Sequence, residues 1–314
     1  MRILITGSRG FVGGGVGRFA ARAGHEVLGV GRATQATPAW PGAYAQADVI
    51  SSDLAPLVRD FAPDAVVHAA GTASVGASFV SPLDDLRAAL LSFANTLDAV
   101  RRSGRAPVIL FPSSAAVYGR PAELPAREDA PLNPISPYGF HKAACELLAR
   151  EYAECFGARV TVCRLFSVFG EAQRRLLVWE LYKQLAGPAR EVWLEGTGAE
   201  TRDYLHIDDA ADALLRLIER EVAEAEPDAG RLRVVNVASG EETNVLELAE
   251  RVRSLVAPGK EVRCRGLERP GDPQRWCADT TRLRALAPGW RPRTFAQRLA
   301  QCVDAWQAGV VEHG

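Results

Sequence analysis

A tyrosine and a lysine four residues apart are suited to exchanging a proton with a substrate hydroxyl. Tyr138 and Lys142 lie in residues 137–156, whose pattern of apolar residues predicts a helix. Two helical residues at this spacing share one face. A neighbouring ammonium favours the phenolate form of a tyrosine, and such a tyrosine can act as a general acid or base while hydride moves to or from a nicotinamide ring. Helices also carry this spacing by chance, so the pair alone does not establish the chemistry.

A serine at the end of a predicted strand supplies a third candidate group. Residues 108–111 are Val-Ile-Leu-Phe, which predicts a strand, and Ser114 follows shortly after it. Open α/β sheets bind ligands at the carboxyl ends of their strands, where a hydroxyl can hydrogen-bond a reacting oxygen as charge develops. A lone serine there can also cap a turn. We predict a catalytic set of Ser114, Tyr138 and Lys142, in which Ser114 and Tyr138 also contact the substrate and Tyr138 and Lys142 the cofactor.

A glycine-rich loop joins the first predicted strand to the first predicted helix. The run TGSRGFVG occupies residues 6–13, between a strand over 3–6 and a helix over 12–23. In this context the glycines permit a tight turn and a close backbone approach to a pyrophosphate, which the helix N-terminus also attracts. A glycine-rich turn without a ligand is the alternative. The predicted cofactor contacts here are Gly7, Arg9, Gly10, Phe11, Val12 and Gly13. Three more glycines inside the helix, Gly14, Gly15 and Gly17, suggest close packing on the cofactor or the sheet.

The end of the second predicted strand, over residues 27–30, indicates which nicotinamide cofactor is used. An acidic residue at this point would bind the 2′-hydroxyl of NAD, but the chain has Gly31 and Arg32 instead. With Arg9, this arginine would suit a 2′-phosphate, so we predict NADP, with NAD as the alternative. Asp48 and Val49 are expected to end the third strand, with the Asp48 carboxylate beside the adenine amine.

The alternation of strands and helices in the first half predicts an α/β fold, a Rossmann-type doubly wound parallel sheet. The later segments are shorter and richer in Arg, Gly and Pro, which predicts a smaller α/β C-terminal domain for the substrate. We place the dinucleotide-binding domain at residues 1–170, with 206–238 returning to it, and the substrate domain at 171–205 and 239–314. An amphipathic stretch over 82–102 is predicted to be one helix.

The bulk composition narrows the function classes. The chain has 314 residues and a formal net charge of −1, so neither nucleic acid nor an anionic membrane surface is expected as a partner. The six cysteines show no CxxC or zinc-like spacing, so we expect buried thiols in a reducing compartment and no metal. The absence of a secretory pattern or a long apolar run predicts a cytoplasmic protein.

Taken together in this order, the motifs resemble those of the extended short-chain dehydrogenases/reductases called NAD-dependent epimerases/dehydratases. The matching runs are TGSRGFVG (6–13), HAAG (68–71), SSAAVYG (113–119), SPYGFHK (136–142), RLFSVFG (164–170) and RDYLHIDD (202–209). The resemblance implies cofactor contacts from Ala69, Ala70 and Gly71. It also implies a C-terminal domain that binds a nucleotide diphosphate sugar, and a homodimer whose seam consists of helices over 82–102 and 138–156.

The resemblance also implies substrate contacts. Arg202 and Arg269 match positions that hold the substrate pyrophosphate, which two arginines can clamp bidentately. Each could instead form a surface salt bridge with a nearby aspartate. Ser167 is expected at the sugar, although many 4-epimerases of this kind carry Asn at its position. Four aromatic residues are candidates either for stacking on a ring or for filling the core: Phe169, Trp179, Trp193 and Trp276.

Departures from the family pattern point to a particular activity. Ala115 and Ala116 stand where 4,6-dehydratases carry an Asp-Glu pair, so dehydration is not expected. The positions near Gly31, Ala89 and Ser167 also differ from many 4-epimerases. We therefore expect an NADPH-dependent reductase of a nucleotide-linked 4-keto-sugar. A nucleotide-sugar 4-epimerase is the close alternative, and a non-catalytic dinucleotide-binding protein is the distant one.

Overall fold

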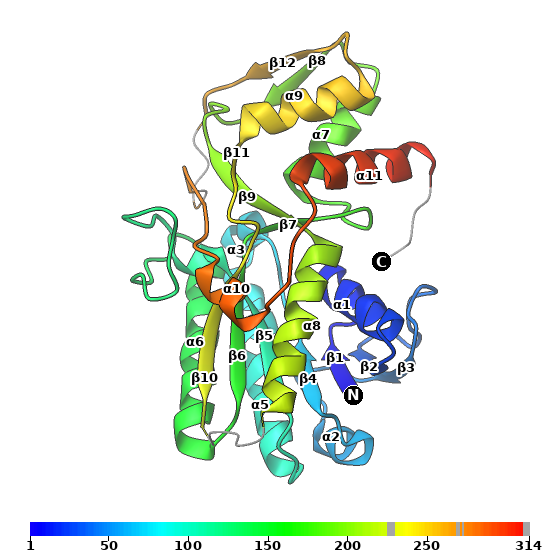
Figure 1. Ribbon diagram of the computed structural model, residues 1–314, viewed down its shortest axis with the longest axis vertical. Helices are drawn as coiled ribbons and strands as arrows, with labels where there is room; N and C mark the ends of the chain where they lie inside the picture. Colours follow the sequence, from blue (N-terminus) through cyan, green and yellow to red (C-terminus); the bar gives the residue numbers. More distant parts are fainter. Residues whose placement is uncertain (225–229, 268–270, 272, 310–314) are drawn as a thin grey trace.

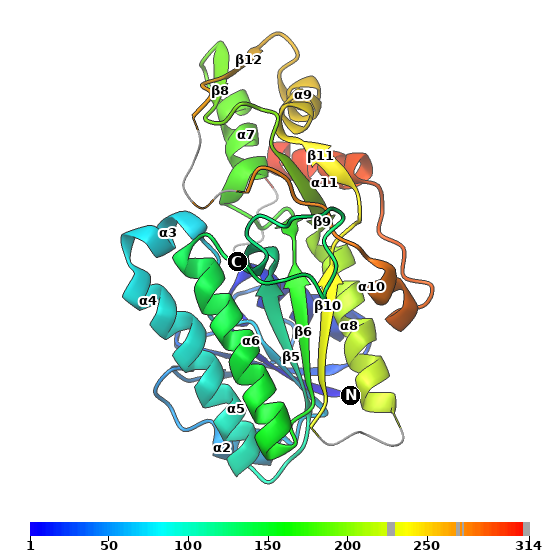
Figure 2. The same ribbon diagram turned by 90° about the vertical axis from the view of Figure 1, so that its left-hand side faces the viewer.

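The computed structural model describes residues 1–224, 230–267, 271 and 273–309. Its largest feature is a seven-stranded parallel sheet in the order β10-β6-β5-β4-β1-β2-β3 (Figures 1 and 2). The strands are β1 (Arg2–Thr6), β2 (Glu26–Gly31), β3 (Ala43–Gln46), β4 (Ala65–His68), β5 (Val108–Ser114), β6 (Val160–Leu165) and β10 (Leu232–Val237). The order reverses direction beside β1, as expected for a doubly wound fold, and this confirms the predicted fold class.

Helices cover both faces of this sheet, as Figure 2 shows in edge view. One face carries α2 (Ala55–Phe61), α5 (Ser92–Arg102) and α6 (Pro137–Phe156), and the other carries α1 (Phe11–Arg22) and α8 (Ile207–Ala223). Alternate strand residues enter the two cores: Ile3 and Ile5 pack on the α1–α8 side, and Leu4 packs on the opposite side. Because both faces are buried, these strands read as continuous apolar runs.

A smaller set of elements lies beyond the carboxyl ends of the main strands (Figure 1). Strands β7 (Ser167–Phe169), β9 (Thr201–His206) and β11 (Glu242–Asn244) form a three-stranded sheet, and β8 (Glu191–Leu194) pairs with β12 (Glu261–Cys264). Helices α7 (Leu176–Ala186), α9 (Val245–Val256) and α11 (Phe295–Gln307) share an apolar core with these strands. The short α10 (Thr281–Leu286) packs instead against the main core.

Helix α6 begins and ends at residues whose chemistry fixes its limits. The Ser136 side chain accepts a hydrogen bond of 3.1 Å from the Gly139 N–H, and Pro137 occupies the first turn, where no N–H partner is needed. Gly157 ends the helix with φ of 70°, a left-handed conformation that favours glycine. The predicted bounds of 137–156 are confirmed.

The stretch over 82–102 differs from the single regular helix that we predicted. It consists of α4 (Pro82–Leu86), a π-helical turn (Arg87–Leu91) and α5. The short α3 (Val75–Val80) precedes it. The Ser92 hydroxyl donates to the carbonyl oxygens of Ala88 and Ala89, at 2.5 and 3.2 Å. Such back-bonding from a serine competes with the regular ladder and bends helices.

The third strand also ends earlier than predicted, at Gln46 rather than at Asp48 and Val49. The Asp48 Oδ1 accepts the Ile50 N–H at 3.0 Å, and the Asp48 N–H donates to Ser52 Oγ at 3.0 Å. Aspartate favours turns by bonding its own backbone two residues on, and this local bonding ends the strand.

Of the six cysteines, Cys145, Cys163 and Cys302 are buried as expected, but Cys155 is exposed at the end of α6. Within the described residues, no helix combines the length and apolar character that crossing a membrane requires.

Candidate active site

The three predicted catalytic residues lie at the carboxyl edge of the main sheet, on the end of β5 and the first turns of α6. Ser114 is the last residue of β5, and its Oγ accepts a hydrogen bond of 3.2 Å from the Ala116 N–H. It therefore does cap the short 3-10 turn over Ala115–Val117, as the alternative interpretation held. The hydroxyl proton is not used in that bond, so Ser114 can still donate to a substrate oxygen.

Tyr138 and Lys142 occupy the first turns of α6 and face β5. Both are buried, at 9% and 6% exposure. The Lys142 ammonium donates to the Pro112 carbonyl oxygen at 3.1 Å and lies 5.8 Å from the centroid of the Tyr138 ring. Since Pro112 is two residues before Ser114, one hydrogen bond ties the helix that carries Tyr138 to the strand that carries Ser114.

Two contacts hold the first turn of α6 close to the strand end. The Tyr138 N–H donates to Ser78 Oγ at 3.1 Å, and this serine belongs to α3. At Gly139, a Cβ would lie 2.6 Å from the Ala116 carbonyl oxygen, so only glycine permits this approach. The helix start is thus held from two sides.

The glycine-rich loop fits a dinucleotide pyrophosphate. Gly7 has φ of 68°, and a Cβ on it would lie 2.6 Å from the backbone of Ala69 and Ala70. The N–H groups of Phe11, Val12 and Gly13 form no hydrogen bond with another described residue, and the first turn of α1 has no acidic side chain. Free N–H groups at a helix N-terminus are a ready anion site. Gly10, Gly71 and the buried Ser8 hydroxyl, which has no partner among the described residues, lie in the same two loops.

Two of the inner glycines of α1, Gly15 and Gly17, pack on other elements of the protein. A Cβ at Gly15 would lie 2.5 Å from the Ile207 side chain, and one at Gly17 would lie 2.3 Å from the Trp40 ring. The expected close packing is therefore present, but its partners are α8 and the loop after β2.

Arg32 follows the carboxyl end of β2, where the ribose-reading acid is missing, and Arg9 lies in the glycine loop between β1 and α1. Both are exposed, and neither forms an ion pair with a residue that the structure describes. The Arg9 Nη1 donates to the Gln35 carbonyl oxygen at 2.5 Å, which turns this guanidinium toward the loop that follows Arg32. The geometry leaves two cations free for an anion.

Asp48 and Val49 are placed differently from the prediction. Asp48 bonds its own turn as described above, and the Val49 carbonyl oxygen accepts from Asn95 Nδ2 at 2.9 Å. They lie in the loop beyond β3, and a contact with adenine stays a prediction.

Ser167 and Arg202 come from neighbouring strands of the three-stranded sheet. Ser167 begins β7 and pairs with Tyr204 of β9, two residues beyond Arg202. The Arg202 guanidinium lies 5.5 Å from the centroid of the Trp276 ring, and its Nη1 donates to the Thr201 carbonyl oxygen at 2.7 Å. Arg202 is 9% exposed, so it is a buried arginine and not a surface one.

Arg269 lies outside the described residues, but its neighbour Gly271 does not. A Cβ at Gly271 would lie 2.7 Å from the Phe79 ring and 3.1 Å from the Ser136 Cβ. This packing places Gly271 against the N-terminal cap of α6, beside the turn that carries Tyr138.

Of the four candidate aromatic residues, one lies beside a predicted site residue. Trp276 contacts Arg202, and its Nε1 donates to the Gly119 carbonyl oxygen at 3.2 Å. Phe169 is buried against Tyr204, His206 and Phe295. Trp179 packs on Tyr182 and Trp306, and the Trp193 ring lies near the guanidinium groups of Arg263 and Arg265.

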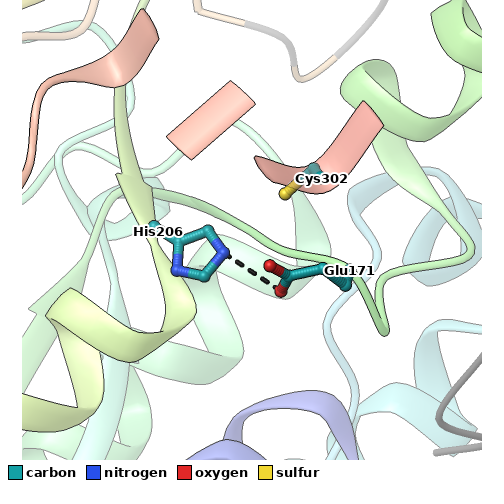
Figure 3. Close-up of side chains that lie close together, drawn as sticks. All are labelled: Glu171, His206 and Cys302. Carbon is teal, nitrogen blue, oxygen red and sulfur yellow. Dashed lines mark hydrogen bonds and ion pairs between the residues drawn. The ribbon is translucent and has the colours of Figure 1, made fainter. Parts of the chain in front are cut away.

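A cluster of Glu171, His206 and Cys302 has the composition of a metal site (Figure 3), with three ligand atoms within 4.8 Å of one another. The His206 Nδ1 accepts the Asp208 N–H at 3.2 Å, so Nε2 carries the proton and donates to Glu171 at 3.1 Å. Burial raises the pKa of the Cys302 thiol. Against its own burial, the hydrogen bond from His206 lowers the pKa of Glu171 to about 2. A metal would have to displace both the proton on Nε2 and the one on sulfur.

This cluster is therefore better described as a hydrogen-bonded link than as a metal centre. The Gln301 side chain donates to Glu171 Oε1 at 2.6 Å, and Trp306 Nε1 donates to the Glu171 carbonyl oxygen at 2.8 Å. It joins the end of β9 and the loop after β7 to α11.

Sequence reasoning missed a buried ion pair next to the predicted catalytic residues. Arg164 and Glu146 are 4% and 7% exposed, and their closest atoms are 2.7 Å apart. The signal was present in the sequence, because Arg164 interrupts the apolar strand Val-Thr-Val-Cys-Arg-Leu. A charge in a strand buried on both faces requires a buried partner.

The doubly wound sheet, the glycine loop at its carboxyl edge and the Tyr–Lys helix beside a serine-ended strand define a dinucleotide-dependent enzyme. Its architecture is that of the extended short-chain dehydrogenases/reductases. Residues 3–238 match the model of the NAD-dependent epimerase/dehydratase family, and the chain belongs to this family.

Similar characterised proteins extend over nearly the whole chain. A UDP-glucose 4-epimerase of Mycolicibacterium smegmatis is 30% identical over 316 residues, which cover 97% of this chain and 98% of that protein. A GDP-6-deoxy-D-mannose reductase of Pseudomonas aeruginosa is 30% identical over 331 residues, covering 99% of each.

Solved structures agree with the fold. A Thermus thermophilus UDP-glucose 4-epimerase in complex with NAD has a TM-score of 0.83 and 28% identity, and covers 98% of this chain and 99% of that one. MoeE5 in complex with UDP-glucuronic acid and NAD has a TM-score of 0.86 and 25% identity, and covers 98% of this chain and 100% of that one.

Proposed function

We propose that this enzyme catalyses NAD(P)-dependent oxidoreduction at C4 of a nucleotide-activated sugar. The observation that carries the proposal is the convergence of Ser114, Tyr138 and Lys142 at the carboxyl edge of the sheet. The Lys142 hydrogen bond to Pro112 supports it, because that bond fixes the Tyr–Lys helix against the serine-ended strand. The glycine loop lies at the same edge, after β1.

Each residue has a distinct role in this proposal. Tyr138 gives its phenolic proton to the C4 oxygen during reduction and takes a proton back in the reverse direction. Lys142 stabilises the phenolate that remains. Ser114 donates to the C4 oxygen and orients it. A nicotinamide dinucleotide, when bound, supplies or accepts the hydride, and the N–H groups of residues 11–13 would hold its pyrophosphate.

The direction that we favour is NADPH-dependent reduction of a 4-keto-sugar. Two features support it. The exposed Arg9 and Arg32 form no ion pair with a described residue and suit a 2′-phosphate, and Ala115 and Ala116 leave no dehydratase acid beside Ser114. The similarity to a GDP-6-deoxy-D-mannose reductase is in line with this direction.

Nucleotide-sugar 4-epimerisation is the second candidate, and the comparisons favour it because several relatives carry the name UDP-glucose 4-epimerase. Tyr138 would accept the C4 hydroxyl proton while the C4 hydride goes to the bound nicotinamide, and it would return a proton when the same hydride adds to the other face of the rotated ketone. The two candidates differ in one measurable respect, since an epimerase does not consume its cofactor.

We further propose that the nucleotide sugar is held by the unit formed of residues 171–205 and 239–314. Arg202, with Arg269, would bind the diphosphate, and Ser167 would contact the sugar. Trp276 packs against Arg202 and would keep its guanidinium in place. The proximity of Gly271 to the cap of α6 is in line with substrate enclosed between the two units.

We also propose a homodimer that buries the outer faces of α4, its π-helical continuation and α6. Leu83, Leu91, Phe140 and Leu147 are 57%, 44%, 59% and 65% exposed on these helices. Exposed apolar patches of this kind mark association surfaces.

The test is a cofactor-consumption assay on the purified protein. NADPH or NADH is supplied with UDP-glucose, UDP-galactose or the 4-keto form of GDP-6-deoxymannose, and products are separated by chromatography. Stoichiometric loss of NADPH with the keto-sugar establishes the reductase. Interconversion of two sugars without net cofactor loss establishes the epimerase instead. Tight NADPH binding with no turnover of any sugar would refute the proposal and favour a non-catalytic dinucleotide-binding protein.

A further inference from the structure

Three polar side chains form a row across three neighbouring strands of the main sheet. Ser113 of β5 is in register with Arg164 of β6, and Arg164 is in register with Asn236 of β10. Their exposures are 3%, 4% and 0%. Polar groups buried this deeply are costly unless every one is hydrogen-bonded. Each of the three side chains therefore needs a buried hydrogen-bond partner.

The row is connected through a fully buried network centred on Glu146. Arg164 donates to both carboxylate oxygens, from Nε at 3.1 and 3.3 Å and from Nη2 at 2.7 Å. The Ser113 hydroxyl donates to the same carboxylate at 2.6 Å. Arg164 Nη1 also donates to the Tyr118 hydroxyl at 2.8 Å. Bidentate arginine–carboxylate pairs fix geometry as well as charge.

Tyr118 continues the network to the third strand. Burial raises the pKa of Tyr118 to about 12, so its hydroxyl keeps its proton and donates it to Asn236 Oδ1 at 2.6 Å. The network thus has a single direction of donation, from Arg164 to Tyr118 to Asn236.

Glu146 lies on the same face of α6 as the catalytic pair, because residues 138, 142 and 146 are spaced by four. Two successive residues of β5 bind two successive turns of this face: the Pro112 carbonyl accepts from Lys142, and Ser113 binds Glu146. The next residue of β5 is Ser114, and the turn of α6 before Lys142 carries Tyr138. These bonds therefore fix where α6 lies along the length of β5.

The same network holds the loop that leads from Ser114 back to Tyr138. Arg164 Nη1 donates to the Glu128 carbonyl oxygen at 2.9 Å, and Asn236 Nδ2 donates to the Ala126 carbonyl oxygen at 2.9 Å. The Asn236 N–H also donates to Glu128 Oε1 at 3.0 Å.

We propose that the buried Glu146–Arg164 pair is a positioning unit that holds Tyr138 and Lys142 in register with Ser114. Neither residue contacts substrate or cofactor in this assignment, and both act through the helix and strand that they join. The inference rests on the proposed function, because it assigns its residues to the reaction of Ser114, Tyr138 and Lys142.

Glu146→Gln and Arg164→Lys are the variants that test it. The glutamine keeps the shape but turns an amide N–H toward the guanidinium, and the lysine keeps the charge but loses the bidentate geometry. We expect each to lower kcat on the order of tenfold to a hundredfold. The substrate KM and the NADPH dissociation constant, measured by nicotinamide fluorescence, stay within about twofold because neither ligand is contacted.

A second buried bidentate pair supplies the matched control. Arg298 of α11 donates to both carboxylate oxygens of Asp209, at 2.9 and 2.5 Å, and is 7% exposed. Arg298→Lys should lower thermal stability about as much as Arg164→Lys but leave kcat unchanged, all assays being run well below both melting temperatures. An equal loss of kcat in the two lysine variants would overturn the assignment.

A double-mutant cycle with Ser114→Ala separates positioning from general damage. If Glu146 acts through Ser114, Glu146→Gln lowers kcat much less in the Ser114→Ala background than in the wild type. Strictly multiplicative losses would contradict the proposal. The wild-type assay distinguishes the two levels of failure, since no turnover by the wild type rejects the proposed function, whereas normal turnover by Glu146→Gln rejects only the positioning unit.

Discussion

The Lys142 ammonium donates a hydrogen bond of 3.1 Å to the carbonyl oxygen of Pro112. A lysine with 6% exposure is thereby held by the backbone of the strand that ends in Ser114. The bond leaves two of its three protons available, and under the proposed function these would serve the Tyr138 phenolate and the cofactor ribose. One backbone carbonyl thus orients the only cation that lies over the Tyr138 ring within the described part of the chain.

Replacing this ammonium with a neutral side chain of similar length is expected to abolish most turnover. We expect Lys142→Met to lower kcat by about 10²- to 10⁴-fold, because Tyr138 loses the charge that stabilises its phenolate. Initial rates with saturating cofactor measure the effect. Lys183→Met on α7, where the lysine forms an exposed pair with Glu180, is the control and keeps full activity. Wild-type rates in Lys142→Met would show that the lysine is structural only.

The end of β2 allows a test of cofactor choice. Arg32→Asp replaces an exposed cation with the acid that binds the 2′-hydroxyl of NAD. We expect the ratio of kcat/KM for NADPH to that for NADH to fall at least about tenfold, since a charge-assisted phosphate contact contributes roughly 1.5–3 kcal/mol. Arg105→Asp, in the loop before β5 at the opposite edge of the sheet, controls for net charge. An unchanged ratio would remove Arg32 from the cofactor site.

Arg202 provides a test of diphosphate binding. Arg202→Lys keeps the charge but loses the planar group that binds bidentately and packs on Trp276. We expect KM for the nucleotide sugar to rise about tenfold or more while cofactor affinity stays unchanged. Isothermal titration with UDP and with UMP checks the assignment, because the loss should be present for the diphosphate and small for the monophosphate. Equal losses for both would place Arg202 elsewhere in the site.

The buried His68 predicts how stability depends on pH. Burial, with a smaller contribution from the Lys142 charge, lowers the pKa of His68 from 6.5 to about 3. In the unfolded chain His68 takes up a proton as the pH falls through 6.5, whereas in the folded chain it stays neutral until about pH 3. Its contribution to the free energy of unfolding is therefore complete above pH 6.5 and is lost as the pH falls toward 3. The slope is about 1.4 kcal/mol per pH unit for this one proton.

Urea unfolding at several pH values measures this slope. His68 is held by Thr6, Thr96 and Ser92, so His68→Asn is expected to be less stable at neutral pH. It should nevertheless lose less further stability on acidification than the wild type. Parallel stability curves for the two proteins would mean that other groups cause the acid sensitivity.

The outer face of α6 tests the proposed homodimer. Leu147 is 65% exposed although its helix is central to the site. Leu147→Asp would bury a charge in a two-fold interface, and the symmetry would place that charge on both subunits. We expect light scattering to show that the variant is a monomer. Leu267→Asp, at a leucine that is 55% exposed outside these helices, is the control. A monomeric wild type would reject the dimer.

Local sequence signals predicted the elements whose ends are marked by capping residues or by a change in apolar pattern. Helix α6 has Ser136, Pro137 and Gly157 at its ends, and its predicted and observed bounds agree. Strands β1 and β5, predicted from residues 3–6 and 108–111, were readable because their residues there are apolar except for Thr6 and are buried on both faces. The placement of Ser114 at the end of β5, and of Tyr138 and Lys142 in the first turns of α6, followed from these elements. Their catalytic roles stay a prediction.

The elements that sequence reasoning missed depend on distant partners. Strands β7 and β11 have three residues each and exist because both pair with β9. The Glu146–Arg164 pair joins residues on different elements, and no local pattern tells which carboxylate meets an arginine in a strand. The π-helical turn near Ser92 is likewise invisible to periodicity, because it adds one residue to a turn that otherwise looks regular.

The position of β10 at the outer edge of the main sheet has a consequence for biosynthesis. A chain leaving the ribosome completes β1 to β6 by residue 165, but a further 66 residues, 166–231, must emerge before β10 begins at residue 232. Until then one edge of β6 is unpaired, and Tyr118, the hydroxyl partner of Arg164, has no Asn236 to accept its hydrogen bond. Open edges of this kind recruit other strands. We therefore expect nascent chains and truncations that end between these points to need chaperone protection, and the last strand of the sheet to be the step that releases them.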